Sequence, residues 1–200
     1  MKKILIVSLL SACTLPAYKI PADEQTLLVN HLQRTAKELR AAVKGLSPEQ
    51  FKFKAAPDKW SVAECLEHIS TSEEFIRQIV TERALKAPAK TEGLAERKKN
   101  DEKILVGMVD RSQKFQAPEP LKPSNKFATP QAAMAHFLKA RKDTVALVKT
   151  SEADFRAHTA PHPLFKELDA YQWLLVVSAH SERHTKQILE VKADPKFPKK

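Results

Sequence analysis

The sequence has little of what an all-β protein requires. It contains three glycines and two tyrosines in 200 residues, and runs of β-branched residues are sparse. Strands favour β-branched and aromatic residues, and tight hairpins depend on glycine. Hydrophobic residues still make up 42% of the chain, which excludes wholesale disorder. The composition therefore favours one helical domain, and a chain of this length can bury a substantial core.

Cysteine is also scarce. Cys13 ends an apolar leader and Cys65 falls inside a predicted helix, and the chain has no other cysteine. A disulfide framework is therefore not indicated. The apolar run of the leader, residues 4–10, is far too short to span a bilayer as a helix.

Residues 1–13 have the pattern of an export signal. Two lysines precede the apolar run, and small residues follow it. The ending LSAC resembles a bacterial lipobox, in which the cysteine is lipidated and becomes the mature N-terminus. We therefore expect an exported protein of the cell envelope or periplasm, anchored to the membrane by a lipid on Cys13. The alternative is an ordinary secretory signal that is cleaved nearby and releases a secreted protein.

The positive charge does not have the pattern of a nucleic-acid-binding protein. The formal net charge is +10, but 24 acidic residues are interspersed with 34 basic ones. No segment combines a high density of lysine and arginine with aromatic residues. Much of the excess lies at the two ends, including the tail 193–200. We expect a mixed-charge surface, which an anionic membrane could attract, and no nucleic-acid partner.

Four long segments have apolar residues at helical spacing. A capping box of Ser61 and Glu64 begins the second, and Thr129 followed by Pro130 begins the third. Between the second and third, we expect residues 87–100 to be irregular and a further helix over 101–115. We expect a long loop connection over 151–168. The four long helices are predicted at 23–44, 60–80, 129–149 and 169–191.

The sequence shows no internal repeat and no second domain. Its predicted organisation is an export signal with a lipobox (1–13), a linker (14–22), one helical domain (23–192) and a basic tail (193–200). Four long helices joined by mostly polar connections predict an all-α four-helix bundle with a long connection between the second and third long helices.

The last helix carries the first candidate site. His180 and His184 are four residues apart, so on a helix their Cβ atoms lie roughly 5–6 Å apart on one face. Both lie on or beside the apolar stripe, away from the face of Glu182 and Arg183. A single histidine in such a place is usually a core residue with one hydrogen bond. Two at this spacing can hold one metal ion through two nitrogens.

A third histidine lies on the inward stripe of the second helix. His68 shares that stripe with apolar residues such as Phe75, while Glu67 and Glu74 lie off it. Three neutral imidazoles leave at least one coordination position open for water or substrate, as in catalytic metal sites. Zinc, nickel and iron(II) all accept imidazole, so the ligands alone do not choose the metal.

The other candidate groups have weaker support from the sequence. Gln187, one turn after His184, is a candidate for a hydrogen bond to a ligand. Cys65 is more typical of a small buried hydrophobe than of a nucleophile, and no general base is evident beyond guesses at Glu64 and His162. The remaining histidines, His31, His136 and His158, are predicted at boundaries or in loops, and Trp60, Tyr171 and Trp173 are predicted to pack at bundle ends.

Familiar nucleotide and protease motifs are missing. HSERH is not the HExxH of zinc proteases. Glu182 is two residues after His180, so it lies on the opposite side of the helix from the expected metal. No GxxxxGK[ST], GxGxxG or GxSxG occurs. These gaps leave the histidines as the main chemical signal in the sequence.

The segments WSVAECLEHI and HSERHTKQI together resemble the DinB-like (damage-inducible) family. The match covers nearly all of the chain after the leader. The resemblance implies an up-down-down-up four-helix bundle that binds a divalent metal through three histidines. Matched residue by residue, the family's metal ligands fall on His68, His180 and His184.

The resemblance also implies candidate reactions. The best-understood relatives are thiol transferases acting with bacillithiol, mycothiol or glutathione, including mycothiol-dependent maleylpyruvate isomerase. We therefore expect a metal-dependent transferase or hydrolase that activates a thiol or water for a small-molecule substrate. The alternative is a non-catalytic envelope protein that binds metal or has a structural role. The sequence leaves open whether the chain forms a homodimer.

Overall fold

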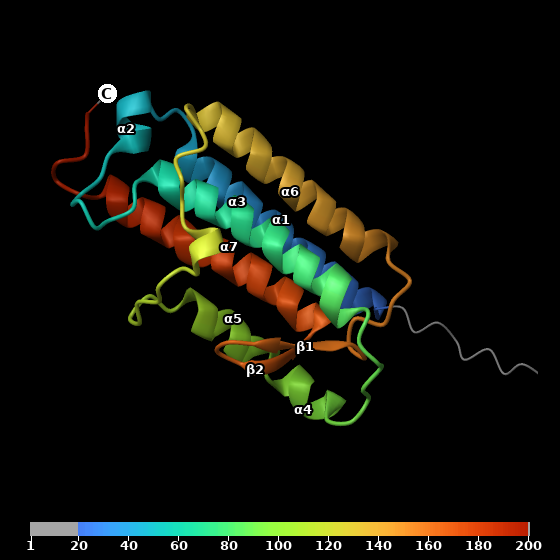
Figure 1. Ribbon diagram of the computed structural model, residues 1–200. Helices are drawn as coiled ribbons and strands as arrows, with labels where there is room; N and C mark the ends of the chain where they lie inside the picture. Colours follow the sequence, from blue (N-terminus) through green and yellow to red (C-terminus); the bar gives the residue numbers. More distant parts are fainter. Residues whose placement is uncertain (1–19, 200) are drawn as a thin grey trace, which may run out of the picture.

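The computed structural model describes residues 20–199 (Figure 1). The leader, with the predicted lipidation site at Cys13, lies outside the described residues, so export and lipid anchoring stay predictions. Within residues 20–199, no helix combines the length and apolar character needed to cross a membrane.

The predicted all-α four-helix bundle is confirmed. Its long helices are α1 (Ala22–Val43), α3 (Val62–Ile79), α6 (Pro130–Thr150) and α7 (Ala170–Lys192). Three begin at side-chain caps: the Ser61 and Asp169 side chains form capping boxes, and the Thr129 side chain accepts a hydrogen bond from a backbone N–H. Such caps satisfy backbone groups that the first turn of a helix leaves unpaired.

Side-chain contacts between helices fix their directions. The side chain of Gln25, near the start of α1, bonds the carbonyl of Val148 near the end of α6, so these two helices are antiparallel. Lys192, at the end of α7, bonds the carbonyl of Ala42 at the end of α1, so α1 and α7 run in parallel.

The other pair completes the topology. The contacts Glu73–Arg141 and Arg77–Thr144 advance together along α3 and α6, so these two helices run in parallel. His68 meets His180 across antiparallel α3 and α7. The order is therefore up-down-down-up, as expected.

The connection between α3 and α6 differs in part from the prediction. It begins with a π-helical turn, η1 (Val80–Ala84). Residues 87–100 are not wholly irregular, because they include α4 (Leu94–Lys99). The next helix, α5 (Asp101–Val109), packs against α7 and ends well before the predicted residue 115. Just after the end of α5, the Arg183 guanidinium of α7 donates hydrogen bonds to the carbonyls of Asp110 and Gln113. In a longer α5, the Asp110 carbonyl would instead accept from a backbone N–H of the helix.

Residues 110–129, here called the crossover loop, lead from α5 to α6. They include one 3-10 turn, η2 (Glu119–Leu121). A short helix, α2 (Pro48–Lys52), lies in the connection between α1 and α3.

The connection over 151–168 was predicted as a loop, but it contains a β-hairpin. Strands β1 (Thr159–His162) and β2 (Lys166–Asp169) pair antiparallel, with Thr159 opposite Asp169. The turn is closed by the His162 side chain, whose Nδ1 accepts the backbone N–H groups of Leu164 and Phe165. Lys166 takes a positive φ of 64° at the end of the turn.

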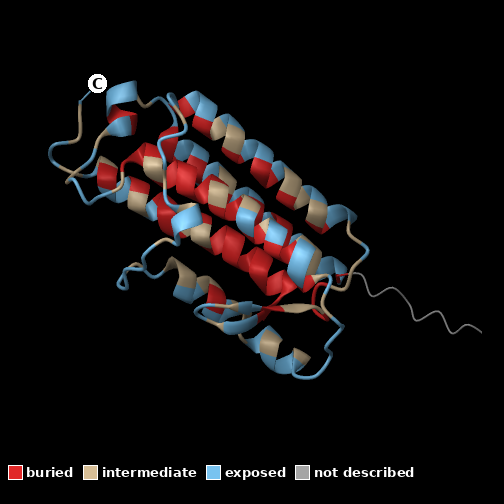
Figure 2. Ribbon diagram, viewed as in Figure 1, coloured by how far each residue is buried: buried red, intermediate tan, exposed pale blue. Residues whose placement is uncertain are grey.

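The core consists of two apolar clusters separated by a polar middle layer. One cluster contains Leu28 and Leu174, and the other contains Leu39 and Ile188. Each long helix places buried polar side chains between them, namely Thr35, His68, Ser72, Glu73, Arg141, Thr144, Ser178, Ser181, His184 and Thr185. Figure 2 shows buried residues along most of α7, whereas α4 has none.

Three side chains differ from their predicted positions. Phe75, predicted inward, is 38% exposed. Glu67 and Arg183, predicted outside the apolar stripes, are 3% and 8% exposed. Both charged groups bind the crossover loop, so they are buried by a segment that the periodicity of their own helix does not reveal.

Candidate metal centre

The site begins with the start of α3. Ser61 and Glu64 exchange hydrogen bonds between side chain and backbone, which fixes the first turn of the helix. His68 follows one turn after Glu64 on the buried side of the helix and is 4% exposed. The helix thus holds the imidazole rigidly in the middle layer, facing α7.

Helix α7 supplies two histidines one turn apart. The ring centroids of His180 and His184 are 4.5 Å apart, and the His68 ring lies 4.9 Å from the first and 4.6 Å from the second. One nitrogen from each ring can be chosen so that all three lie within 4.8 Å of one another. The structure therefore brings together the three histidines that the sequence singled out.

The spacing of the nitrogens suits a shared ion. The Nε2 atoms of His68 and His180 are 3.1 Å apart. Two imidazole nitrogens that each lie about 2.1 Å from one ion are separated by about 3.0–3.4 Å in octahedral or tetrahedral geometry. The residues present therefore fit a divalent metal, and zinc, nickel and iron(II) all remain compatible with them.

Hydrogen bonds at the far side of two rings fix their tautomers. The carbonyl of Leu121 lies 2.8 Å from Nδ1 of His68, and Oε1 of Gln187 lies 2.8 Å from Nδ1 of His184. Oxygen atoms of these types only accept, so each Nδ1 carries the proton and donates it. Each Nε2 then keeps its lone pair, which is the form that binds a metal.

The orientation of Gln187 is supported in turn. Arg111 of the crossover loop donates to Oε1 of Gln187 at 3.4 Å and forms a two-pronged ion pair with Glu190. The amide oxygen therefore faces two donors, His184 and Arg111. Gln187 therefore makes the kind of hydrogen bond to a candidate ligand that the sequence suggested.

All three imidazoles are kept neutral by burial. Burial lowers the pKa of His68, and it lowers the pKa of His180 well below the ordinary value, with a further contribution from the neighbouring His184. Burial also lowers the pKa of His184 to about 3. Protons therefore compete weakly for these nitrogens at neutral pH, as metal binding requires.

Trp60 was predicted to pack at a bundle end, but it lies against the site. Its ring stacks on His184 with centroids 5.8 Å apart and also contacts His68 at 4.8 Å. Spacing could not indicate this, because Trp60 precedes the first turn of α3. The indole screens one side of the histidine group from solvent.

Cys65 lies one turn before His68 and is fully buried in an apolar cluster. Burial raises the pKa of its thiol, which disfavours the reactive thiolate. The small hydrophobic role expected for this cysteine agrees with its surroundings.

The remaining histidines lie apart from the group of three. His136 faces Glu74, and Nδ1 of His158 donates to the carbonyl of Ala87. His162 packs against Trp173, about two helical turns before His180. Glu64, the other guess at a general base, uses its carboxylate in the helix cap and in an ion pair with Lys54.

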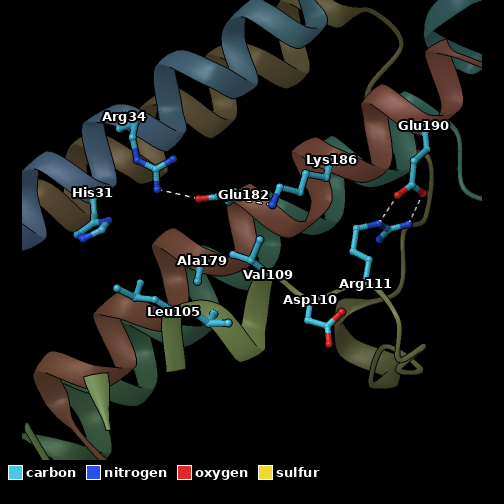
Figure 3. A pocket seen from close by; sticks show the side chains of 11 residues that line it. His31, Arg34, Leu105, Val109, Asp110, Arg111, Ala179, Glu182, Lys186 and Glu190 are labelled. Atoms are coloured by element: carbon cyan, nitrogen blue, oxygen red, sulfur yellow. Dashed lines mark hydrogen bonds and ion pairs between the residues drawn. The ribbon is translucent and has the colours of Figure 1, made fainter. Parts of the chain in front are cut away.

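A groove of about 580 Å³ lies between α1, α5 and α7 (Figure 3). His31 and Arg34 of α1 face it from one side and Arg111 from the other, while Glu182 and Lys186 come from α7. Its apolar part comes from residues such as Leu105 and Ala179. None of the three site histidines lines this groove, but Arg111 borders it and also reaches Gln187.

Comparisons with known proteins agree with this fold. Residues 31–188 match the family model of the DinB superfamily. The uncharacterised protein YuaE of Bacillus subtilis (strain 168) is 31% identical over 151 residues, which cover 75% of this chain and 88% of YuaE.

A solved structure provides a second comparison. YfiT from Bacillus subtilis, described as a probable metal-dependent hydrolase with an unusual four-helix bundle topology, aligns with a TM-score of 0.52 and 14% identity. The alignment covers 87% of this chain and 89% of YfiT. At this identity the likeness establishes the fold alone.

Proposed function

This chain belongs to the DinB superfamily, and from that premise we propose that it binds one divalent metal ion through His68, His180 and His184. We propose further that it is a metal-dependent enzyme, either a hydrolase that activates water or a transferase that activates a thiol. The description of YfiT as a probable metal-dependent hydrolase supports this class of reaction.

The observation that carries the proposal is the convergence of three neutral imidazoles. His68 and His184 have fixed tautomers that leave Nε2 free, and the His180 ring completes the group. Buried polar atoms are normally paired within the protein. The hydrogen bond between Nε2 of His68 and Nε2 of His180 shares a single proton between two of the rings, whereas one cation can bind all three.

The protein's own residues prepare the site for chemistry. When bound, a divalent ion supplies Lewis acidity that lowers the pKa of water or of a thiol. Leu121 and Gln187 orient two of the imidazoles, and Trp60 excludes water from one side. Among the described residues the group contains three histidines and no fourth protein ligand, which supports a coordination position open to a substrate.

A non-catalytic metal-binding protein is the second candidate. The observation in its favour is that the groove in Figure 3 is lined by none of the three histidines, while His68 and His184 are buried. The visible spectrum of the Co²⁺-loaded protein separates the two candidates. A change of that spectrum on adding a small thiol or azide supports the enzyme, and an unchanged spectrum supports the binder.

The metal centre itself is tested by the variant His184→Ala. We expect it to lose most of its bound metal, with an affinity loss above the roughly 10–100-fold that follows loss of an outer hydrogen-bond partner. The measurement is elemental analysis of protein purified without a chelator and without nickel affinity resin.

The matched control is His158→Ala. That histidine also makes a hydrogen bond through Nδ1, but its partner is Ala87 in a distant connection, so its metal content should equal that of the wild type. Full metal content in His184→Ala would show that the proposed ligand set is wrong.

A further inference from the structure

Glu67 is a buried carboxylate held by a loop. Its side chain accepts hydrogen bonds from the backbone N–H of Ser124 at 2.7 Å, the Ser124 hydroxyl at 2.9 Å and the backbone N–H of Lys126 at 2.9 Å. Burial of a carboxylate is costly unless its oxygens are hydrogen-bonded. These three donors, all from the crossover loop, satisfy both carboxylate oxygens and thereby fasten the loop to α3.

The loop is shaped to make this contact. Asn125, between the two residues that donate backbone N–H groups, adopts a left-handed φ of 60°, a conformation that asparagine tolerates better than most residues. The reversal there lets the N–H groups on both sides of Asn125 reach one carboxylate.

The same loop also touches a metal-site histidine. The carbonyl of Leu121, three residues before Ser124, accepts the Nδ1–H of His68 at 2.8 Å. The intervening residues include Pro123, whose ring restricts φ, and Leu121 ends a 3-10 turn. The position of Ser124 therefore constrains the position of the Leu121 carbonyl.

Two successive residues of α3 thus hold the loop at two points. We infer that Glu67 is a positioning residue of the metal centre, because it fixes the loop so that the Leu121 carbonyl keeps His68 in the tautomer with Nδ1 protonated. In that tautomer Nε2 has a free lone pair toward His180, 3.1 Å away. The part of this inference that concerns metal affinity rests on the proposed function.

The other tautomer would be a poor ligand. If the carbonyl withdraws, the proton on His68 can move to Nε2, where it blocks the lone pair that faces the site. Loss of an outer partner of a ligating histidine typically costs about 10–100-fold in metal affinity. Glu67 acts on His68 only through the crossover loop. We therefore expect about a tenfold loss of metal affinity when the hydrogen bonds between Glu67 and that loop, here called the clamp, are broken.

The test compares Glu67→Gln with Glu74→Gln. The first variant replaces one acceptor oxygen by an NH₂ group, which opposes an N–H donor of the loop. The second removes a partly exposed carboxylate from the same helix, where it faces His136. The readouts are the ¹⁵N chemical shifts of His68 in metal-free protein, which report its tautomer, and Co²⁺ affinity from the visible spectrum.

We expect one Nδ1–H form of His68 in the wild type and in Glu74→Gln, and a mixture of both forms with about tenfold weaker Co²⁺ binding in Glu67→Gln. An unchanged tautomer in a folded Glu67→Gln protein would overturn the inference. A changed His68 tautomer in Glu67→Gln with unchanged Co²⁺ affinity would overturn the part of the inference that concerns metal binding.

Two further results keep the inference separate from its premise. If the wild type binds no Co²⁺ but Glu67→Gln changes the tautomer, the clamp is supported and the proposed function fails. If Glu67→Gln does not fold, Ser124→Ala replaces it, because that change removes only the hydroxyl donor and leaves both backbone donors. A smaller shift of the tautomer in the same direction supports the clamp, and no shift overturns it.

Discussion

The middle layer of the bundle contains two polar clusters that meet on α7. In the first, Arg141 uses all five of its N–H donors within the protein, on Glu73, Ser181, Thr35 and the carbonyl of Leu32. In the second, three histidines, one of them the residue before Ser181, direct nitrogens toward one another. Both clusters draw residues from α3 and α7.

The difference lies in how each cluster is balanced. The donors of Arg141 match acceptors of the protein, and its charge is matched by Glu73, so this cluster is complete. Two of the three imidazoles, His68 and His184, are acceptors at the nitrogens that converge, and the group contains no carboxylate among the described residues. A complete cluster holds helices together, whereas an incomplete one is suited to bind a cation from outside.

The largest expected effect comes from breaking the complete cluster. Arg141→Met leaves the Glu73 carboxylate buried, 2% exposed, without its cation. Removal of one partner of a buried ion pair typically costs about 3–5 kcal/mol of stability. The free energy of unfolding, measured by urea denaturation, should fall by that amount.

The double variant Arg141→Met with Glu73→Leu is the control. It removes both charges, so it should recover most of the lost stability while the metal content stays near that of the wild type. If Arg141→Met alone costs less than about 1 kcal/mol, as for an exposed pair, the cluster does not hold the helices as described.

An intermediate effect is expected from the partner of His184. Gln187→Leu removes the acceptor that keeps Nδ1 of His184 protonated, so metal affinity should fall about 10–100-fold with little loss of helix. Competition with a chelator of known affinity measures the change. Gln78→Leu, at an exposed position of α3, is the control, and equal affinities for the two variants would contradict the role of Gln187.

The smallest effect is expected from a histidine outside the middle layer. His162 is neutral like the three clustered histidines, but its Nδ1 accepts hydrogen bonds from two N–H groups of its own turn. Burial lowers its pKa to about 4, below the unfolded value of about 6.5. Its contribution to stability is therefore full above pH about 6.5 and declines as pH falls toward about 4, because the unfolded chain takes up a proton first.

This pH dependence is measured against His162→Asn, which does not titrate and keeps an acceptor near the same place. The thermal midpoint of the wild type should fall more between pH 7 and pH 5 than that of the variant. His68, His180 and His184 are present in both proteins, so their effect cancels in the comparison. Equal falls in the two proteins would show that His162 does not contribute.

Most of the fold and the histidine group could be predicted from local spacing. The caps at Ser61, Thr129 and Asp169 act within three residues, and the pair His180 and His184 is set by one turn of helix. The hairpin was missed for a local reason as well. Its turn is closed by a histidine side chain and by a lysine at positive φ, where the usual signal would be glycine or asparagine.

The sequence by itself determined most of the apolar residues on the inner face of each long helix, because helical periodicity depends only on neighbours within two turns. Only the tertiary structure decided which charged side chains are buried and which groups form hydrogen bonds with them. Glu67 meets donors 57 and 59 positions away in the chain, and the carbonyls that accept from Arg183 lie 70 to 75 positions away. A helix pattern that places such residues outside contains no information about a loop that folds over them, and hydrogen bonds to that loop make their burial possible.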